Sequence, residues 1–355
     1  MRCWHAFEHM CVLANGDVAC SICDGRADFV LGNVYSESPS VIFNGPRYRT
    51  LRRLMLRGEG PFCPATGRNC LLKDIEEDEN DPEAHRAVRS LQIEPTTACN
   101  LRCLTCLVRD IHPVRGQGGD GDLRFRLWDG ARRTKQGLAP ILRQLPGMDG
   151  SSRHGPLRAL LARGQMRDDR GGTLPLPVIE AVIDDLHEGL ERIDFFNYGE
   201  PFLYPHLLDA LRHARRRCPQ VTMAISTNGL PITEDTEEAI ISEGLVDWIL
   251  FSIDGVDADA YAFYRAGGCL RTAWNHLLRF RQKARSSGVH VVWQYLVFRW
   301  NDTDRELQTA LELAEEHGIT LWFEFVRTWG RSKRRESDLA WLQPFLKPGT
   351  SLPAS

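Results

Sequence analysis

The residues of this sequence best suited to chemistry are its cysteines. The chain of 355 residues contains 11 of them, and Cys99, Cys103 and Cys106 follow one another with the spacing CxxxCxxC. Three thiolates this close in sequence can converge on one inorganic centre if they lie on a loop. A structural zinc ion takes four ligands, whereas a cubane iron–sulfur cluster on three cysteines leaves one iron open. The spacing favours such a cluster, with zinc completed by a distant Cys or His as the alternative.

The other cysteines are unevenly spread. Cys218 and Cys269 stand alone, and the default interpretation of such a cysteine is a small buried hydrophobe. A disulfide scaffold is typical of small secreted domains, but this chain is long, and residues 1–5 lack the apolar stretch of a secretory signal. No segment resembles a membrane span. We therefore expect a cytoplasmic metalloprotein, and the first seventy residues contain six further candidate ligands: Cys3, Cys11, Cys20, Cys23, Cys63 and Cys70.

Composition and charge limit the classes of partner. The chain is 43% hydrophobic and 26% charged, which is ordinary for a folded soluble protein and excludes disorder over most of its length. A net charge of −3 gives no global reason to bind a polyanion. Because no basic stripe interleaved with aromatic residues is present, the sequence also disfavours a nucleic-acid modifier.

Strand-like and helix-like runs alternate from residue 90 onward. The apolar, β-branched runs predict strands at 91–96, 192–198, 221–226, 248–254, 289–298 and 320–326. Amphipathic runs predict helices at 178–190, 204–217, 233–243, 258–287 and 303–317. Thr303 with Glu306 has the capping-box pattern, and Gly244, Gly288 and Gly318 stand where helices end in a left-handed residue. This alternation predicts an α/β fold with a parallel sheet, a partial (β/α)6 TIM-like barrel, although periodicity alone leaves a doubly wound sheet open.

The rest of the chain divides around this barrel. An Asn15-Gly16 turn predicts a hairpin over 12–20, and a basic–apolar pattern predicts a helix over 47–57. A Gly- and Arg-rich insertion at 110–176 reads as a mobile surface segment or, alternatively, as a lid or anion-binding segment. The predicted parts are a small N-terminal Cys-rich domain at 1–74, a linker at 75–89, the barrel at 90–330 and a C-terminal tail at 331–355.

The cysteine loop and its context, PTTACNLRC at 95–103, resemble the radical S-adenosylmethionine (radical SAM) enzymes, over residues 90–330. The resemblance implies that Cys99, Cys103 and Cys106 hold a 4Fe–4S cluster whose open iron binds SAM. An electron from a donor such as flavodoxin or ferredoxin would then release a 5′-deoxyadenosyl radical that abstracts a substrate hydrogen. Thr105 stands where many members have an aromatic residue, which puts the usual adenine contact in doubt.

Residues that follow the second and third strands match further family motifs. Tyr198, Gly199 and Glu200 resemble the Gly-Gly-Glu motif that receives the SAM ammonium group, with Tyr198 in place of the first glycine. Asn228 stands where members place a polar contact to SAM. Alone, these residues would read as strand-exit turns.

Four residues around the fourth and fifth strands complete the expected SAM contacts. By the same resemblance, Ser252 and Asp254 lie near the methionyl or ribose groups, and Arg265 binds the SAM carboxylate. Gln294 is a further candidate polar contact. Without the resemblance, Arg265 reads equally well as a solvated cation at a helix end.

The N-terminal cysteines resemble the SPASM-type auxiliary cluster domain, which usually follows the barrel rather than precedes it. The matching residues, for a second 4Fe–4S cluster, are Cys3, Cys20, Cys63 and Cys70, with Cys11 and Cys23 as possible substitutes. The alternative is a zinc ribbon built from the Cys20/Cys23 and Cys63/Cys70 pairs.

The resemblance implies a radical SAM oxidoreductase or C–H-modifying enzyme. Electron loss to the auxiliary cluster would give oxidation or dehydrogenation, whereas a hydrogen atom returned by a thiol, for which Cys269 is the candidate, would give epimerisation. The expected substrate is a sugar or cyclitol-type small molecule, and a ribosomally made peptide is the alternative. A cluster- or zinc-binding module without catalysis is the alternative of another class.

Overall fold

The computed structural model describes residues 5–20, 30–56, 62–63, 68–69, 84–106, 172–326, 330–334 and 336–348. Within them nine strands form one sheet, in the spatial order β11-β10-β9-β8-β7-β6-β1-β2-β3. Six consecutive strands, all parallel to their neighbours, fall on the segments that the sequence predicts: β6 (Ser90–Ile93), β7 (Arg192–Phe195), β8 (Thr222–Thr227), β9 (Trp248–Ser252), β10 (His290–Val297) and β11 (Thr320–Phe325).

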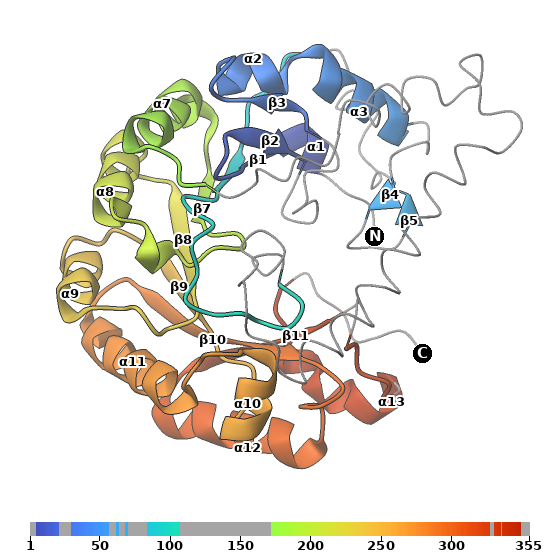
Figure 1. Cartoon of the computed structure of the whole chain (residues 1–355), viewed down its shortest axis with the longest axis vertical. Helices are drawn as coiled ribbons and strands as arrows, with labels where there is room; N and C mark the ends of the chain where they lie inside the picture. The colour runs from blue at the N-terminus through green and yellow to red at the C-terminus, as the bar shows by residue number, and fades with distance from the viewer. Residues whose placement is uncertain are drawn as a thin grey trace, which may run out of the picture.

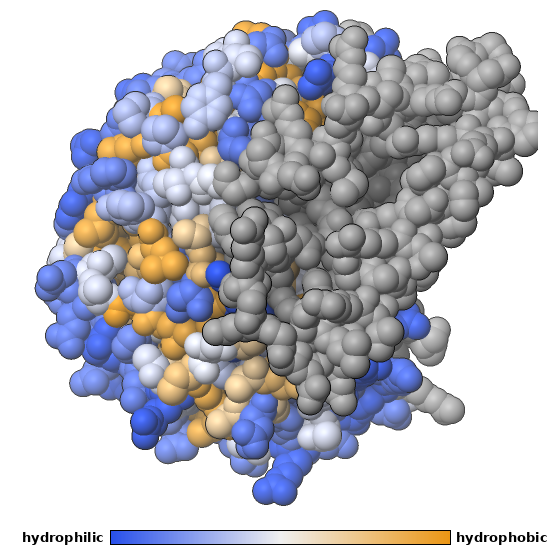
Figure 2. Space-filling model, in the orientation of Figure 1, coloured by the Kyte–Doolittle hydropathy of each residue, from blue (hydrophilic) through white to orange (hydrophobic). Residues whose placement is uncertain are grey.

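Helices cover one face of this sheet and form the outer arc of Figure 1. They are α7 (Leu176–Leu186), α8 (Leu207–Arg217), α9 (Glu234–Ser242), α10 (Ala258–Tyr264), α11 (Leu270–Lys283) and α12 (Asp304–His317). Ile193 and Phe195 of β7 lie in one apolar core with Ile183 and Leu211 of the helices. Hydrophilic residues dominate the outer rim (Figure 2). The arrangement confirms the predicted partial barrel, because a doubly wound sheet would carry helices on both faces.

The opposite side of the sheet, called the inner face below, is lined by the alternate residues of the same strands. Its apolar part is a separate cluster built on Ala224, Leu250 and Val292, against which Trp248 and Trp322 pack. Apolar side chains therefore pack on both faces of the barrel sheet, as expected for parallel strands.

Two of the predicted helix ends are confirmed. The Thr303 hydroxyl accepts from the backbone N–H of Glu306 at the start of α12, and Gly318 ends that helix with φ 63°. Gly244 follows α9 with φ 60°. Each glycine therefore has the left-handed conformation that its position predicts.

Two predictions about helices are wrong. The single helix predicted over 258–287 is two helices, because the chain turns between α10 and α11 at Gly267, whose φ is 89°. Gly288 does not have a left-handed backbone, because a short 3₁₀ helix, η5 (Ala284–Ser286), ends the preceding helix first. Periodicity alone did not reveal the turn, since the apolar pattern continues through it.

The N-terminal segment forms the predicted hairpin and helix. β1 (His9–Val12) pairs antiparallel with β2 (Asp17–Ala19) around Gly16, whose φ is 82°. β3 (Gly32–Asn33) extends the hairpin, and the segment also contains α1 (His5–Glu8), α2 (Pro39–Phe43), α3 (Pro46–Leu56), and the separate antiparallel pair β4 (Phe62–Cys63) and β5 (Arg68–Asn69).

The hairpin is joined to the barrel, which the sequence did not indicate. β1 lies parallel to β6, with Met10 opposite Leu91 and Val12 opposite Ile93. These four side chains belong to the same apolar core as the barrel helices. The N-terminal strands and the barrel therefore share one sheet and one core. Of the predicted linker at 75–89 and insertion at 110–176, residues 75–83 and 110–171 lie outside the described residues.

Two short helical segments, α13 (Glu336–Leu339) and η6 (Ala340–Phe345), lie at the end of the described chain. The barrel also contains the 3₁₀ turns η3 (His187–Gly189) and η4 (Pro201–Leu203). After η6, Leu346 forms a parallel bridge with Phe323 of β11. The tail thus runs along the edge of the barrel sheet. Among the described helices, none is long and apolar enough to cross a bilayer.

Candidate active site

The three-cysteine loop follows β6 and is buried on one side. Cys99, Cys103 and Cys106 share one apolar cluster with Tyr264 and Phe298. Burial raises the pKa of the Cys99 thiol and raises that of Cys103 to about 11. Three cysteine sulfur atoms on one short loop match the donor set that an iron–sulfur cluster requires.

Backbone hydrogen bonds hold this loop against the barrel rim at both ends. The N–H of Glu200 donates to the carbonyl of Ala98 at 2.8 Å, which ties the loop to the end of β7. The N–H of Arg102 donates to Ala266 at 3.0 Å, and that of Leu104 donates to Tyr264 at 2.9 Å. The turn between α10 and α11 therefore supports the loop from the other side.

Gly199 is needed for the first of these contacts. A Cβ atom at this position would lie 1.8 Å from the carbonyl oxygen of Thr96 and 3.0 Å from the Cα of Thr97. Only a residue without a side chain permits this approach. The neighbouring Tyr198 donates its N–H to the Glu94 carboxylate at 3.1 Å, and its carbonyl lies 3.9 Å from the sulfur of Cys106.

Glu200 is buried and fully engaged inside the protein. Its carboxylate accepts from the N–H of Asn228 at 2.7 Å, the hydroxyl of Thr227 at 2.8 Å and the N–H of Phe202 at 3.2 Å. Burial raises the pKa of this carboxyl to about 7. In this structure, the side chain joins the ends of β7 and β8.

Asn228 connects the end of β8 to the cysteine loop. Its amide nitrogen donates to the side-chain oxygen of Asn100 at 2.8 Å and lies 3.9 Å from the sulfur of Cys99. Its amide oxygen accepts from the N–H of Leu230 at 3.0 Å. The residue that the sequence assigns to a SAM contact therefore also fixes the position of Cys99.

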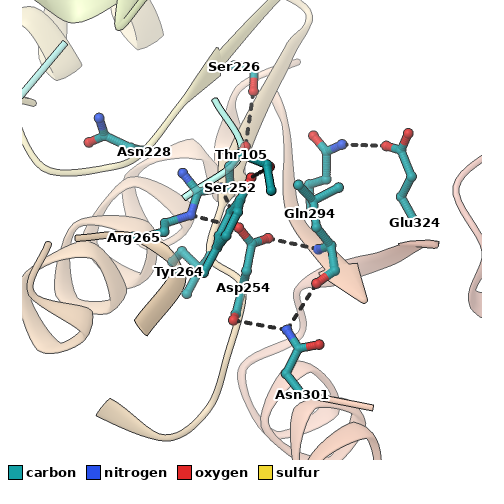
Figure 3. A network of polar contacts seen from close by, with 12 residues as sticks. Thr105, Ser226, Asn228, Ser252, Asp254, Tyr264, Arg265, Gln294, Asn301 and Glu324 are labelled. Atoms are coloured by element: carbon teal, nitrogen blue, oxygen red, sulfur yellow. Dashed lines mark hydrogen bonds and ion pairs between the residues drawn. The ribbon is translucent and has the colours of Figure 1, made fainter. Parts of the chain in front are cut away.

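Asp254 and Arg265 form a buried ion pair (Figure 3). The guanidinium donates to one carboxylate oxygen at 2.8 Å from Nε and 2.6 Å from Nη2, while the other oxygen accepts from the N–H of Leu296 at 2.8 Å. Burial opposes the charge of Arg265, but the Asp254 carboxylate outweighs it and raises the Arg265 pKa above its usual range. Within the described residues, Nη1 of Arg265 makes no hydrogen bond, which leaves it for an anionic group.

Thr105 meets an aromatic residue from another element. Its hydroxyl lies 3.2 Å from the hydroxyl of Tyr264, and Tyr264 packs against Phe298 with ring centroids 4.3 Å apart. Phe298 stacks on Trp300 at 4.5 Å and 10°. Aromatic rings thus stand beside the cysteine loop even though the loop itself lacks one.

The inner face carries the remaining predicted residues. The hydroxyls of Ser226 and Ser252 lie 3.3 Å apart on β8 and β9, and Gln294 of β10 donates to Glu324 of β11 at 2.8 Å (Figure 3). Ser252 and Gln294 are neighbours in register. The structure therefore brings the predicted barrel residues to one rim, with Ser252 and Gln294 below Asp254.

Sequence reasoning missed Glu94, Glu324, Tyr264 and Lys347. Glu94 is buried and accepts from the N–H of Ala14 at 3.2 Å as well as from Tyr198. A charged residue directly after an apolar strand was the available signal for Glu94, as it was for Asp254. Lys347 reaches the site only through the tertiary fold.

The other cysteines are only partly described. Cys11 is fully buried on the inner face of β1, beside Gln92 in register, and Cys20 is partly exposed. Cys3, Cys23 and Cys70 lie outside the described residues, and so does the side chain of Cys63, so the auxiliary ligand set stays a prediction.

The two isolated cysteines differ from each other. Cys218 is a buried core residue, as expected. Cys269 is exposed, so its interpretation as a buried hydrophobe is wrong: it caps the start of α11, where hydrogen bonding with Thr272 lowers the pKa of its thiol.

No three His, Cys, Asp or Glu side chains of the described residues converge on a single metal ion. The loop with its three cysteines, and Nη1 of Arg265, which makes no hydrogen bond within the described residues, together fit a cluster with SAM beside it.

Comparison with known proteins agrees with this site. The profile of the Radical SAM superfamily matches residues 93–314, which is more than half of the chain. The chain belongs to the radical SAM superfamily. The profile of the SPASM iron–sulfur cluster-binding domain matches residues 3–70, so this radical SAM protein carries that domain before its barrel. Membership implies a 4Fe–4S cluster and SAM, and the SPASM match implies a further iron–sulfur cluster.

Solved structures of radical SAM enzymes resemble the chain at low identity. They include TYW1 with a bound lysine–pyruvate adduct (16% identity, 74% of each chain, TM-score 0.39) and anSMEcpe with bound AdoMet (16%, 70% of this chain and 56% of that one, 0.41). Methylornithine synthase (PylB) matches at 13% identity, over 74% of this chain and 64% of that one, with a TM-score of 0.44. The chain covers only 32% of another match, TsrM from Kitasatospora setae. No curated protein sequence matches the chain.

Proposed function

We propose that this radical SAM enzyme oxidises a sugar or cyclitol-type small molecule by abstracting a hydrogen atom from one of its carbons. When bound, the 4Fe–4S cluster and SAM supply a 5′-deoxyadenosyl radical. Loss of one further electron and one proton from the substrate completes a two-electron oxidation, for example of an alcohol to a ketone.

The observation that carries the proposal is the way in which the cysteine loop is fixed to the rim. Gly199 and Asn228 bring the ends of β7 and β8 against Ala98 and Cys99. On the other side, Asp254 binds Nε and Nη2 of Arg265, and within the described residues Nη1 makes no hydrogen bond. An arginine fork held in this way suits a carboxylate such as that of SAM.

Glu200 has a positioning role in this proposal. Because its oxygen atoms accept three hydrogen bonds from the protein, we assign the SAM ammonium group to backbone carbonyls of 198–200 rather than to this carboxylate. Ser252 and Asp254 then border the methionyl or ribose side of SAM.

The pairing of β1 with β6 favours oxidation over epimerisation. It places Cys11, a cysteine of the SPASM match, on the inner face beside the first barrel strand. An electron acceptor next to the barrel would remove the second electron. Epimerisation would instead need a hydrogen-atom donor, and the candidate, Cys269, is exposed at the start of α11.

A one-electron donor such as flavodoxin or ferredoxin would reduce the cluster. A ribosomally made peptide remains the alternative substrate class. Within the described residues, the hydroxyl and amide side chains on the inner face favour the small molecule.

Anaerobic purification followed by reduction with dithionite in the presence of SAM tests the proposed activity. Two cubanes predict roughly eight iron atoms per chain, and the wild type should form 5′-deoxyadenosine. Cys99→Ala should lose this product and retain the auxiliary iron, whereas Cys218→Ala, in the apolar core, should keep both clusters. Absence of SAM cleavage in the fully loaded wild type would refute the proposed function.

A further inference from the structure

A row of polar side chains crosses the inner face below the Asp254–Arg265 pair. It comprises Ser226 of β8, Ser252 of β9, Gln294 of β10 and Glu324 of β11 (Figure 3). These residues alternate with core residues such as Phe251 and Phe323, which face the helices. Because Ser252 precedes Asp254 by two residues, the row lies about 7 Å along the strand from the Asp254–Arg265 pair.

The C-terminal tail adds a cation to this row. Lys347 donates its N–H to the carbonyl of Phe323 at 2.9 Å, which continues the bridge between the tail and β11. Its ammonium group lies 2.8 Å from Oε2 of Glu324, the same oxygen that accepts from Gln294. Glu324 and Lys347 are each about one-third exposed, at 32%. The tail therefore neutralises the carboxylate without burying it.

Acceptor atoms remain open along the row. Within the described residues, Oε1 of Glu324 and Oε1 of Gln294 accept no hydrogen bond. The two serine hydroxyls bond each other at 3.3 Å, which leaves one of their protons for another acceptor. These atoms suit a ligand with several adjacent hydroxyl or amine groups.

An apolar surface adjoins the polar row. Trp248 and Trp322 stack with centroids 5.6 Å apart and planes at 27°, and both pack against Leu250 and Val292. Trp322 is the register neighbour of Gln294. A ring that presents hydroxyls to the row can therefore lay its C–H groups on the two partly exposed indole rings.

We propose that Ser226, Ser252, Gln294, Glu324 and Lys347 form the substrate floor and select a neutral, hydroxyl-rich ring compound. The inference rests on the proposed function and names its substrate class. Glu324 accepts from ring hydroxyls, and Lys347 cancels its charge, so that a neutral polyol is preferred to a cationic amino sugar. The tail is thereby a specificity-determining part of the site.

The test compares binding of three probes to the anaerobic, cluster-loaded full chain by titration calorimetry: myo-inositol, D-glucosamine and trialanine. The wild type should bind myo-inositol in preference to the other two. Glu324→Ala should weaken myo-inositol about tenfold or more, the loss expected for a hydrogen bond to a charged group. Lys347→Ala should shift the preference about tenfold towards D-glucosamine, because it leaves the carboxylate uncompensated.

Matched controls separate binding from folding. Glu316→Gln, on the exposed side of α12, should bind as the wild type does, and Glu324→Gln keeps the shape of the side chain if Glu324→Ala fails to fold. Unchanged myo-inositol affinity in Glu324→Ala, or in Glu324→Gln where the alanine variant does not fold, overturns the proposed substrate floor, and so does an unchanged probe preference in Lys347→Ala. So does trialanine binding that depends on Glu324, or no binding of either ring compound.

Formation of 5′-deoxyadenosine by the same wild-type preparation, without any probe, distinguishes the two proposals. If the wild type cleaves SAM and the floor variants bind the probes as the wild type does, the proposed substrate floor is refuted and the proposed function is not. Absence of SAM cleavage refutes the proposed function, while the probe titrations still decide what the row binds.

Discussion

Arg265, which follows the end of α10, meets Asp254, which follows β9, with two guanidinium nitrogens 2.8 and 2.6 Å from one carboxylate oxygen. The sequence assigned both residues to SAM, but the structure shows that they also bind each other. Asp254 thus sets the direction in which the guanidinium presents its open nitrogen.

Removing one member of this pair should destabilise the protein. Asp254→Asn or Arg265→Met leaves a buried charge without its partner, which costs about 3–5 kcal/mol of unfolding free energy. The double variant should regain most of that loss, as measured by urea unfolding. The exposed pair Arg212–Glu243 is the control, since loss of a solvent-exposed ion pair should change the unfolding free energy very little. A double variant as unstable as the singles would contradict the assigned pairing.

A methyl group at Gly199 should displace the cysteine loop. Its Cβ would lie 1.8 Å from the Thr96 carbonyl, so Gly199→Ala should cost about 1–3 kcal/mol and reduce the iron bound at the loop. Gly288→Ala is the matched control, because nothing lies within 4 Å of the position and its φ is not left-handed. Equal thermal stability and iron content in the two variants would show that the Gly199 contact is unimportant.

Asn228 should be required to hold the SAM-site cluster in place. Asn228→Ala removes the contacts to Asn100 and Cys99, and we expect the SAM-induced change in the cluster's electron paramagnetic resonance spectrum to weaken at least about tenfold, with auxiliary iron retained. Asn275→Ala, on the exposed side of α11, should leave that change intact. A normal spectroscopic response in Asn228→Ala would exclude this positioning role.

Glu200 should make stability depend on pH. Its pKa is raised by burial to about 7 from 4.5, so the folded protein keeps a proton that the unfolded chain has lost. The stability contributed by this group is therefore complete below about pH 4.5 and falls as pH rises to about 7, by up to about 3 kcal/mol. Urea unfolding from pH 5 to 8 should show this decline, and Glu200→Gln should flatten it. An equally steep decline in Glu200→Gln would assign the effect to another group.

The sequence by itself determined the cysteine loop, the parallel strands and the order of the residues that follow them. These features are local, since a spacing of three cysteines, an apolar run or an Asn-Gly turn depends on neighbours in the chain. The break in the predicted helix over 258–287 was missed because its apolar pattern continues through the turn at Gly267.

Only the tertiary structure decided which distant groups meet. The pairing of β1 with β6 depends on backbone hydrogen bonds that any apolar strand could make. No residue type in the sequence therefore predicts it. Glu324 and Lys347 are separated by enough chain that their meeting depends on how the tail docks on β11. Local sequence therefore determined the cysteine loop, whereas packing determined which distant side chains lie beside it and which groups line the inner face.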